Sequence, residues 1–263
     1  MDTNRELWNL WTKFNFVSEE YSGLLHEVRA GKTTLKEIER KEMGEVAGKT
    51  LLHLQCHFGL DTLSWAREGA IVTGVDISEV AITLAQSLSQ ELNLEAEFIC
   101  SNIYDLPTVL DRQFDIVYTS GGVLSWLPDL SRWAEIIAGY LKPNGTVYIV
   151  EGHPMVRIFK PRTDGQGKPV EWGYFDQGPI EVEERRSNGN PTLHAAHKAY
   201  YWPHSLGEIV TALCSAGLRL EFLHEFPGRV EEYSYEEIEP GHYELRVHRK
   251  LEIPSHFSIR ATR

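Results

Sequence analysis

The sequence is poor in cysteine and in long apolar runs, and each shortage excludes a class of protein. Its three cysteines, Cys56, Cys100 and Cys214, are an odd and widely spaced set that fits neither a disulfide framework nor a zinc site. We expect them to be reduced and mostly buried, and we expect no metal. No apolar run approaches the roughly 20 residues of a membrane span, and the start MDTNRELWNLW lacks the basic and then apolar layout of a secretory signal. The prediction is a cytoplasmic protein without membrane contact.

Positive charge is also scarce. Lys and Arg number 26 against 38 Asp and Glu, which gives a formal net charge of -12. Such a surface repels nucleic acids and anionic membranes. We therefore expect a small molecule as the partner, bound by a monomer or a homodimer. A chain of 263 residues is long enough for one large core with insertions.

Short apolar runs alternate with helical patterns through the middle of the chain. The runs that suit buried strands are residues 51–54, 70–76, 96–102, 114–120 and 146–152. Helical patterns lie between them at residues 61–67, 78–92 with Ser78 as N-cap, and 130–141, which is followed by the turn sequence KPNG. This alternation predicts an α/β fold with a doubly wound, mostly parallel sheet.

The flanking segments have other patterns. Residues 1–45 carry apolar positions at helical spacing, which predicts two or three amphipathic helices that form an N-terminal helical cap. Residues 46–263 then form the main domain, with 153–203 as an insertion on the substrate side. The insertion has weak strand signals at 178–184 and 194–202. After it we expect a helix over 205–218 and strands over 218–226 and 256–263, while the acidic stretches 181–184 and 231–240 read as solvated faces.

The loops that follow the strands carry the candidate binding residues, because ligands of open parallel sheets bind beyond the carboxyl ends of the strands. The loop after the first strand contains Gln55, Cys56, His57, Gly59 and Leu60, and it turns into a helix whose first amides face the ligand. Gly59 suits that tight turn with or without a ligand.

Asp76 ends the second strand, where a carboxylate can accept hydrogen bonds from both hydroxyls of a ribose. Ser101, Asn102 and Ile103 follow the third strand and suit the edge and faces of an adenine. Asn102 could instead form an Asx turn. Ser120 and Gly121 follow the fourth strand, where small residues permit close approach of a ligand.

In these segments the sequence resembles the class I S-adenosylmethionine-dependent methyltransferases. The resemblance covers residues 48–152 and is carried by KTLLHLQCHFGLDTLSWAREGAIVTGVDIS, SNIYDLP, FDIVYTSGG and LKPNGTVYIVEG. It implies a Rossmann-like sheet of seven strands that ends with an antiparallel one. It also implies that residues 55–61 hold the amino-acid part of the cofactor, Asp76 the ribose and Asn102 the adenine amino group. Ile77 and Ile103 would flank the adenine.

The first loop departs from the common pattern of that family, acidic-x-Gly-x-Gly-x-Gly. His53, Gln55 and His57 stand at the acidic position and at the first two glycines. The HLQCHFG loop, together with the downstream segment HSLGEIVTAL, resembles a bacterial subgroup of these enzymes. For His53, which lies inside the first strand, a buried core histidine is an equal alternative to a ligand contact.

Aromatic residues could close the site. Trp8, Trp11 and Tyr21 belong to the N-terminal segment, and plain packing between helices is the common role of such residues. The alternative is a lid, since this segment folds over the cofactor in many members of that family, and Tyr21 is then our candidate contact. Trp126 follows the fourth strand, where packing against the adenine edge and packing in the core are both open.

For the acceptor side, the candidate catalytic residues are His153, Tyr201 and His204, because their side chains can orient or deprotonate an acceptor near neutral pH. Solvent-facing loop positions are the alternative for each. Methyl transfer is an in-line displacement that depends on proximity and alignment, so it does not require a nucleophile motif.

These observations predict methyl transfer from S-adenosylmethionine to a small-molecule acceptor, with S-adenosylhomocysteine as product. One alternative is a cofactor-binding protein that is non-catalytic or regulatory. Another is an oxidoreductase of the NAD type, but such enzymes carry Gly-x-Gly-x-x-Gly after the first strand, and this segment lacks it.

Overall fold

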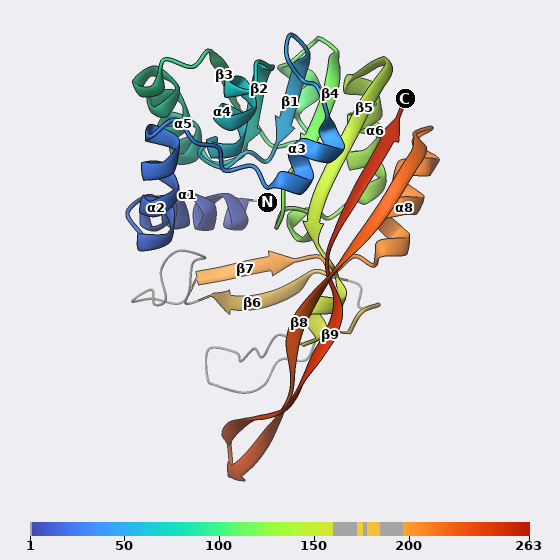
Figure 1. Cartoon of the computed structure of the whole chain (residues 1–263). Coiled ribbons are helices and arrows are strands. Elements are labelled where there is room, and N and C mark those ends of the chain that lie inside the picture. Colours follow the sequence, from blue (N-terminus) through green and yellow to red (C-terminus); the bar gives the residue numbers. More distant parts are fainter. Residues whose placement is uncertain (1, 160–172, 176–177, 185–196) are drawn as a thin grey trace.

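The computed structural model describes residues 2–159, 173–175, 178–184 and 197–263 (Figure 1). Its helices are α1 (Asp2–Phe16), α2 (Glu19–Arg29), α3 (Glu37–Met43), α4 (Leu60–Arg67), α5 (Glu79–Leu92), α6 (Leu130–Tyr140), α7 (Met155–Ile158) and α8 (Leu206–Ser215), with 3-10 turns η1 (Leu106–Thr108) and η2 (Leu124–Trp126). Its strands are β1 (Thr50–Leu54), β2 (Ile71–Asp76), β3 (Ala96–Cys100), β4 (Phe114–Thr119), β5 (Leu141–Gly152), β6 (Ile180–Glu184), β7 (His197–Tyr201), β8 (Arg219–Glu239) and β9 (His242–Thr262).

Seven strands form one sheet in the order β3-β2-β1-β4-β5-β9-β8. Strands β1 to β5 pair in parallel, and β9 runs antiparallel to β5. The fold class is therefore confirmed as a doubly wound, mostly parallel α/β sheet. From β1 the chain first builds outward to β2 and β3 and then returns to place β4 on the other side of β1. This reversal puts a topological switch point beyond the carboxyl ends of β1 and β4, which is where such sheets bind ligands.

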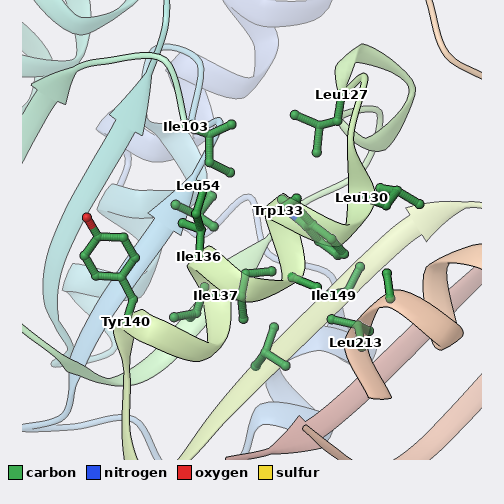
Figure 2. Close-up of a cluster of buried hydrophobic side chains, with 14 of the residues drawn as sticks. Leu54, Ile103, Leu127, Leu130, Trp133, Ile136, Ile137, Tyr140, Ile149 and Leu213 are labelled. Atoms are coloured by element: carbon green, nitrogen blue, oxygen red, sulfur yellow. The ribbon is translucent and has the colours of Figure 1, made fainter. Parts of the chain in front are cut away.

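One face of the sheet is covered by α6 and α8. Figure 2 shows the hydrophobic core that lies between these helices and the strands. Trp133 and Ile137 of α6 are fully buried and pack in one cluster with Leu54 of β1 and Ile149 of β5. Truncating a buried residue such as Trp133 to alanine costs about 3–5 kcal/mol. Strand β1, whose carboxyl end lies at the switch point, is therefore held by a tightly packed core layer.

The other face is covered by α3, α4 and α5. Because side chains alternate along a strand, Leu51 of β1 belongs to this layer, where it packs with Trp65 of α4. Helix α5 begins as expected: the Ser78 hydroxyl caps it by accepting from the N–H of Ala81 at 3.1 Å. The helix ends at Asn93, which adopts the left-handed conformation with φ of 50°.

The N-terminal segment forms α1, α2 and α3, and α1 lies next to the two-stranded sheet of β6 and β7 at the carboxyl edge of the main sheet (Figure 1). The amide of Asn4 joins them. Its Nδ2 donates to the carbonyl of Tyr200 at 2.8 Å, and its Oδ1 accepts from the N–H of Tyr200 at 2.9 Å. Residues 160–172, 176–177 and 185–196 of the expected insertion, including the start of the expected strand 194–202, lie outside the described residues.

Strands β8 and β9 are much longer than expected. We predicted strands only over 218–226 and 256–263, but the two strands pair from Arg219 to Glu239 and extend far beyond the rest of the sheet (Figure 1). The prediction was wrong for residues 227–255 because this arm has no core face to produce an apolar alternation along its whole length, and Pro227 and Pro254 suggest breaks. Ladder pairing and exposed ion pairs, such as Arg249 with Glu232, build it instead.

Two smaller expectations also need correction. Strand β5 begins at Leu141 and not at 146, because Leu141 already pairs with Phe114 and the KPNG residues form an irregularity in the ladder. All three cysteines are free, but only Cys56 is buried, while Cys100 and Cys214 are exposed.

Among the residues that the structure describes, no helix has both the length and the apolar character needed to cross a bilayer.

Candidate functional site

A cavity of about 290 Å³ lies at the carboxyl ends of β1, β2, β3 and β4. This volume is near the lower end of the range for small-molecule sites, roughly 300–1,000 Å³. Every cofactor-binding residue proposed from the sequence is part of its wall: Tyr21, Gln55, Cys56, His57, Gly59, Leu60, Asp76, Ile77, Ser101, Asn102, Ile103, Ser120, Gly121 and Trp126. The fold thus brings together side chains from five separate segments.

The loop after β1 has an alternating left-handed backbone. Gln55 has φ of 57°, His57 of 52° and Gly59 of 79°. These are the three positions at which the common family pattern has glycine, so the loop keeps a glycine-like conformation although two side chains are present. A left-handed non-glycine residue costs about 1–2 kcal/mol. Gly59 has a second constraint, because a Cβ there would lie 2.7 Å from the ring of Phe98.

The carboxylate of Asp76 hydrogen-bonds to the backbone of that loop. Its Oδ2 accepts from the N–H of His57 at 2.8 Å, and its Oδ1 accepts from the N–H of Ser78 at 2.9 Å. A carboxylate has about four lone-pair positions, and the backbone of Ile77 also bonds to this one, so at least one position remains for a ligand. Burial is the main cause that raises the pKa of Asp76 to about 6, against the lowering effect of these backbone hydrogen bonds.

Asn102 forms the Asx turn that the sequence left open. Its Oδ1 accepts from the N–H of Tyr104 at 3.1 Å. A carbonyl oxygen has two lone pairs, so a second hydrogen bond to this atom remains sterically and chemically compatible with the turn. Ile77 and Ile103 line the cavity from neighbouring loops and supply apolar surface on its two sides.

Two polar atoms in the wall lack partners within the described part of the chain. Gln55 Oε1 and His57 Nε2 are buried and make no hydrogen bond, while Gln55 Nε2 donates to the carbonyl of Val123 at 3.2 Å. Burial lowers the pKa of His57 to about 3, so its imidazole is neutral at physiological pH. A buried polar group without a hydrogen bond costs about 1–3 kcal/mol. The wall therefore exposes two polar atoms to the cavity that no described residue hydrogen-bonds.

His53 is a core histidine. It is 1% exposed and bonds through Nδ1 to the hydroxyl of Thr62 at 2.8 Å and through Nε2 to that of Ser120 at 3.2 Å. Burial lowers its pKa to about 3. Its ring supports Ser120, which lines the cavity, but His53 itself is not part of the wall.

Glu151, which the sequence analysis did not single out, shapes the loop after β4. Its buried carboxylate accepts from the N–H groups of Gly122, Val123 and Leu124, and also from that of Gly152. This loop carries four cavity residues in succession, from 120 to 123. No local motif marks Glu151, because the loop that it holds is nearly 30 residues away in sequence.

Indole rings form one side of the cavity. Trp8 of α1 and Trp126 of η2 both line it, and their rings meet edge to face with centroids 5.2 Å apart. Trp11 packs against Trp126 behind them at 5.8 Å and does not line the cavity. Trp8 also contacts the ring of His57 at 5.5 Å. Helix α1 is thereby attached to both the first and the fourth loop.

The cavity wall is acidic and holds no Lys or Arg among its lining residues, all of which belong to the described part of the chain. Its carboxylates are Asp76 and Asp61, and Asp61 accepts from the Thr34 hydroxyl at 2.5 Å. The sequence analysis included Asp61 within the loop 55–61, but it missed Thr34 and Asn4 as wall residues, since tertiary contact alone brings them there. In the described residues no group of His, Cys, Asp and Glu could hold a metal ion.

The three candidate catalytic residues are not among the lining residues of the cavity. His153 is buried at the end of β5, where Nδ1 accepts from the N–H of Met155 and Nε2 lies 2.9 Å from Glu225. The hydroxyl of Tyr201 donates to Glu184, and His204 Nε2 lies 2.7 Å from the carbonyl of Leu127. Tyr201 and His204 each contact a wall residue: the ring centroid of Tyr201 lies 4.4 Å from that of Trp126, and the bond of His204 is to Leu127.

Comparison with protein families finds that residues 52–149 match the model of a methyltransferase domain. The chain is also 35% identical over 101 residues to the ubiquinone biosynthesis O-methyltransferase of Coxiella burnetii, a match to 38% of this chain and 42% of that protein. The protein of the same name in Pseudomonas syringae pv. tomato is 30% identical over 120 residues, 45% of this chain and 51% of the relative. These matches thus span about half the length of the relatives.

Solved structures share the fold over more of the chain. An S-adenosylmethionine-dependent methyltransferase from Mesorhizobium loti has a TM-score of 0.58 at 19% identity, with 85% of this chain and 95% of that chain covered. One from Clostridium acetobutylicum has a TM-score of 0.59 at 13% identity, with 92% and 97% covered. The seven-stranded sheet therefore has the Rossmann-like fold of these methyltransferases.

Proposed function

We propose that this protein transfers the methyl group of S-adenosylmethionine to a small-molecule acceptor. The observation that carries the proposal is Asp76, which lines the cavity at the carboxyl end of β2 and keeps accepting capacity for the hydroxyls of a ribose. The match of residues 52–149 to a methyltransferase domain supports the same function independently.

The other wall residues fit a nucleoside in a defined direction. Ile77 and Ile103 suit the two faces of an adenine, and Asn102 Oδ1 can accept from its amino group. With the base there and the ribose at Asp76, the group on the 5′ carbon extends toward the loop of Gln55 and His57. That loop is the part of the wall with unpaired polar atoms.

The residues of this chain would act mainly by position. When bound, S-adenosylmethionine would supply the methyl group, whose bond to sulfur breaks as its bond to the acceptor forms. The left-handed loop and Asp76 hold the donor, and Trp8 and Trp126 exclude water from the wall beside it. Acidic and aromatic walls stabilise a bound cation. His153, Tyr201 and His204 remain candidates for orienting the acceptor or accepting its proton.

The domain organisation fits this function. We propose that residues 1–45 cap the cofactor end of a methyltransferase domain formed by 46–263, since Trp8 and Tyr21 line the cavity. Residues 153–203 would line the acceptor side. We also propose that the HLQCHFG loop defines a bacterial subgroup, that the protein acts in the cytoplasm without nucleic acid or membrane partners, and that it is a monomer or homodimer.

The decisive experiment is calorimetric titration of the protein with S-adenosylmethionine, S-adenosylhomocysteine and NADH. We expect the first two to bind and NADH not to bind. Incubation with S-adenosylmethionine and a library of small acceptors, with release of S-adenosylhomocysteine as readout, then tests transfer. Binding without turnover on any acceptor would support a regulatory protein, and binding of NADH alone would contradict the proposal.

A further inference from the structure

The arm formed by residues 227–255 of β8 and β9 is a two-stranded ribbon. Within the described part of the chain its strands pair only across the hairpin, from Pro227 with Pro254 to Glu239 with His242. The ribbon extends far beyond the rest of the sheet (Figure 1). Because a two-stranded ribbon by itself is marginally stable in water, the side chains on its two faces decide how the arm is stabilised.

One face of the outer arm carries ion pairs, and we call it the polar face. Glu232 lies opposite Arg249 in the ladder, and Glu236 lies opposite Glu244 on the same side of the ribbon. Arg249 pairs with Glu232 at 2.5 Å, while Arg246 pairs with Glu236 at 3.0 Å and with Glu244 at 2.9 Å. The charges of this face compensate one another, so the face is suited to water.

The opposite face carries a row of apolar and aromatic side chains. Tyr233 lies opposite Val247, Tyr235 lies opposite Leu245, and Tyr243 follows at the same spacing of two residues. We call these five residues the apolar row. The rings of Tyr233 and Tyr235 meet edge to face with centroids 5.8 Å apart, and Leu245 and Val247 are 42% and 51% exposed. A contiguous apolar group bordered by charges marks an interaction surface, which a single exposed apolar residue does not.

The two ends of the apolar row differ in charge. At the base of the arm stand Arg229 and Lys250, each opposite a glutamate in the ladder. Arg229 makes no ion pair within the described residues, and Lys250 lies 4.0 Å from the nearest carboxylate. At the tip, Glu237 and Glu239 pair with no cationic side chain of the described chain, and Glu237 accepts only from the N–H of Gly241. The tip is therefore acidic, and the base holds the cations.

We propose that the apolar rows of two copies of this chain pack face to face around a twofold axis, with the two arms antiparallel, and so form a homodimer. A twofold interface brings the same patch of both copies together, and a row with tyrosines at its centre is suited to that contact. Antiparallel arms place the acidic tip of each copy beside the base with Arg229 and Lys250. Parallel arms would oppose the two acidic tips, which repel each other.

This surface is separate from the proposed methyl-transfer site, because no residue of the apolar row lines the cavity. The first test is sedimentation of the full chain over a range of concentrations, where we expect a reversible dimer. Leu245→Glu places a charge in the row and should weaken the dimer at least tenfold. The matched control is Ser234→Glu, which adds the same charge on the polar face opposite Arg246 and should change the affinity by less than about twofold. A monomer at every concentration, or equal losses in both variants, would overturn the proposal.

A charge exchange tests the direction of the arms and leaves the apolar row intact, so it also serves if Leu245→Glu does not fold. Arg229→Glu should weaken the dimer about fivefold, since it opposes two acidic groups. Adding Glu239→Arg in the same chain should restore the affinity. The two positions stand at opposite ends of the arm in one copy, so only contact between copies can couple them. Additive losses in the double variant would overturn the antiparallel arrangement.

Discussion

The carboxylate of Asp76 accepts a hydrogen bond from the backbone N–H of His57, with 2.8 Å between the two heavy atoms. This bond joins the end of β2 to the loop after β1, two segments that are separated by helix α4 in the sequence. The residue that we propose to bind ribose therefore also restrains the left-handed backbone of the neighbouring loop. Loss of the carboxylate should affect both halves of the cavity.

Replacement of Asp76 by alanine should weaken binding of S-adenosylhomocysteine at least tenfold, about 1.4 kcal/mol. The variant loses the acceptors for the ribose hydroxyls and the restraint on His57. Isothermal titration calorimetry measures the change, with circular dichroism to verify folding. Asp111→Ala is the control, because Asp111 is an exposed carboxylate outside the cavity wall. Unchanged affinity in folded Asp76→Ala would refute the ribose role.

Binding should also weaken as the pH falls through about 6. Burial raises the pKa of Asp76 to about 6, so the free protein protonates this carboxyl over a range in which an exposed Asp stays ionised. A protonated carboxyl accepts fewer hydrogen bonds, and the apparent affinity should drop by up to about tenfold per pH unit below the pKa. His53 and His57 do not titrate in this window because their pKa values are about 3.

The matched variant for this profile is Asp76→Asn, which has no titrating group at the position. Its affinity should be lower at pH 7.5 and should vary little between pH 5 and 7.5. If the variant and the unmodified protein lose affinity in parallel as the pH falls, another group controls the effect, and Asp76 is not the source.

A methyl group at Gly59 should destabilise the protein more than one at Gly217. Both glycines have positive φ, 79° and 85°, so alanine costs about 1–2 kcal/mol of backbone strain at each. At Gly59 the new Cβ also overlaps Phe98, while at Gly217 it meets nothing within 4 Å. Overpacking typically adds about 1–3 kcal/mol. Urea denaturation of both variants gives the difference, and equal losses would mean that Phe98 moves aside at no cost.

Glu151→Gln should lower stability and loosen the loop after β4. The amide replaces one accepting oxygen by a donor, which then faces backbone N–H groups such as those of Gly122 and Gly152. Leaving buried donors unpaired costs about 2 kcal/mol or more. Thermal unfolding checks stability, and hydrogen exchange of residues 120–127 checks the loop. The control is Glu236→Gln, at an exposed ion pair on the arm, which should change stability by less than about 0.5 kcal/mol. A similar loss of stability in both variants would contradict the specific role of Glu151.

Local sequence patterns predicted the alternating strands and helices of the parallel sheet. The runs that became β1, β2 and β4 were recognisable because both faces of a central strand are buried. Ser78 was recognisable as a cap because capping acts within one helical turn. Asp76 was equally accessible to prediction, since a parallel sheet places the end of β2 beside the loop after β1. The candidate cofactor residues of the strand-end loops line one cavity for that reason, while Tyr21 reaches it from α2.

The long arm and the acceptor side were different. Residues 227–255 form strands whose partner lies across the hairpin and whose side chains mostly face solvent, so no apolar alternation marked their whole length. His153, Tyr201 and His204 stood near the expected loops, but their side chains bond to Glu225, Glu184 and the carbonyl of Leu127, and none of the three lines the cavity.

By itself the sequence determined the parallel part of the sheet, the edge at which the cavity forms and the residues that line its proposed nucleoside half, because each depends on contacts between neighbouring strands. Only the tertiary structure decided the conformation of the loop at Gln55 and His57 and the role of Glu151. Backbone angles that no side chain prefers persist only when surrounding groups impose them. Here those groups, above all Asp76, come from other segments of the chain.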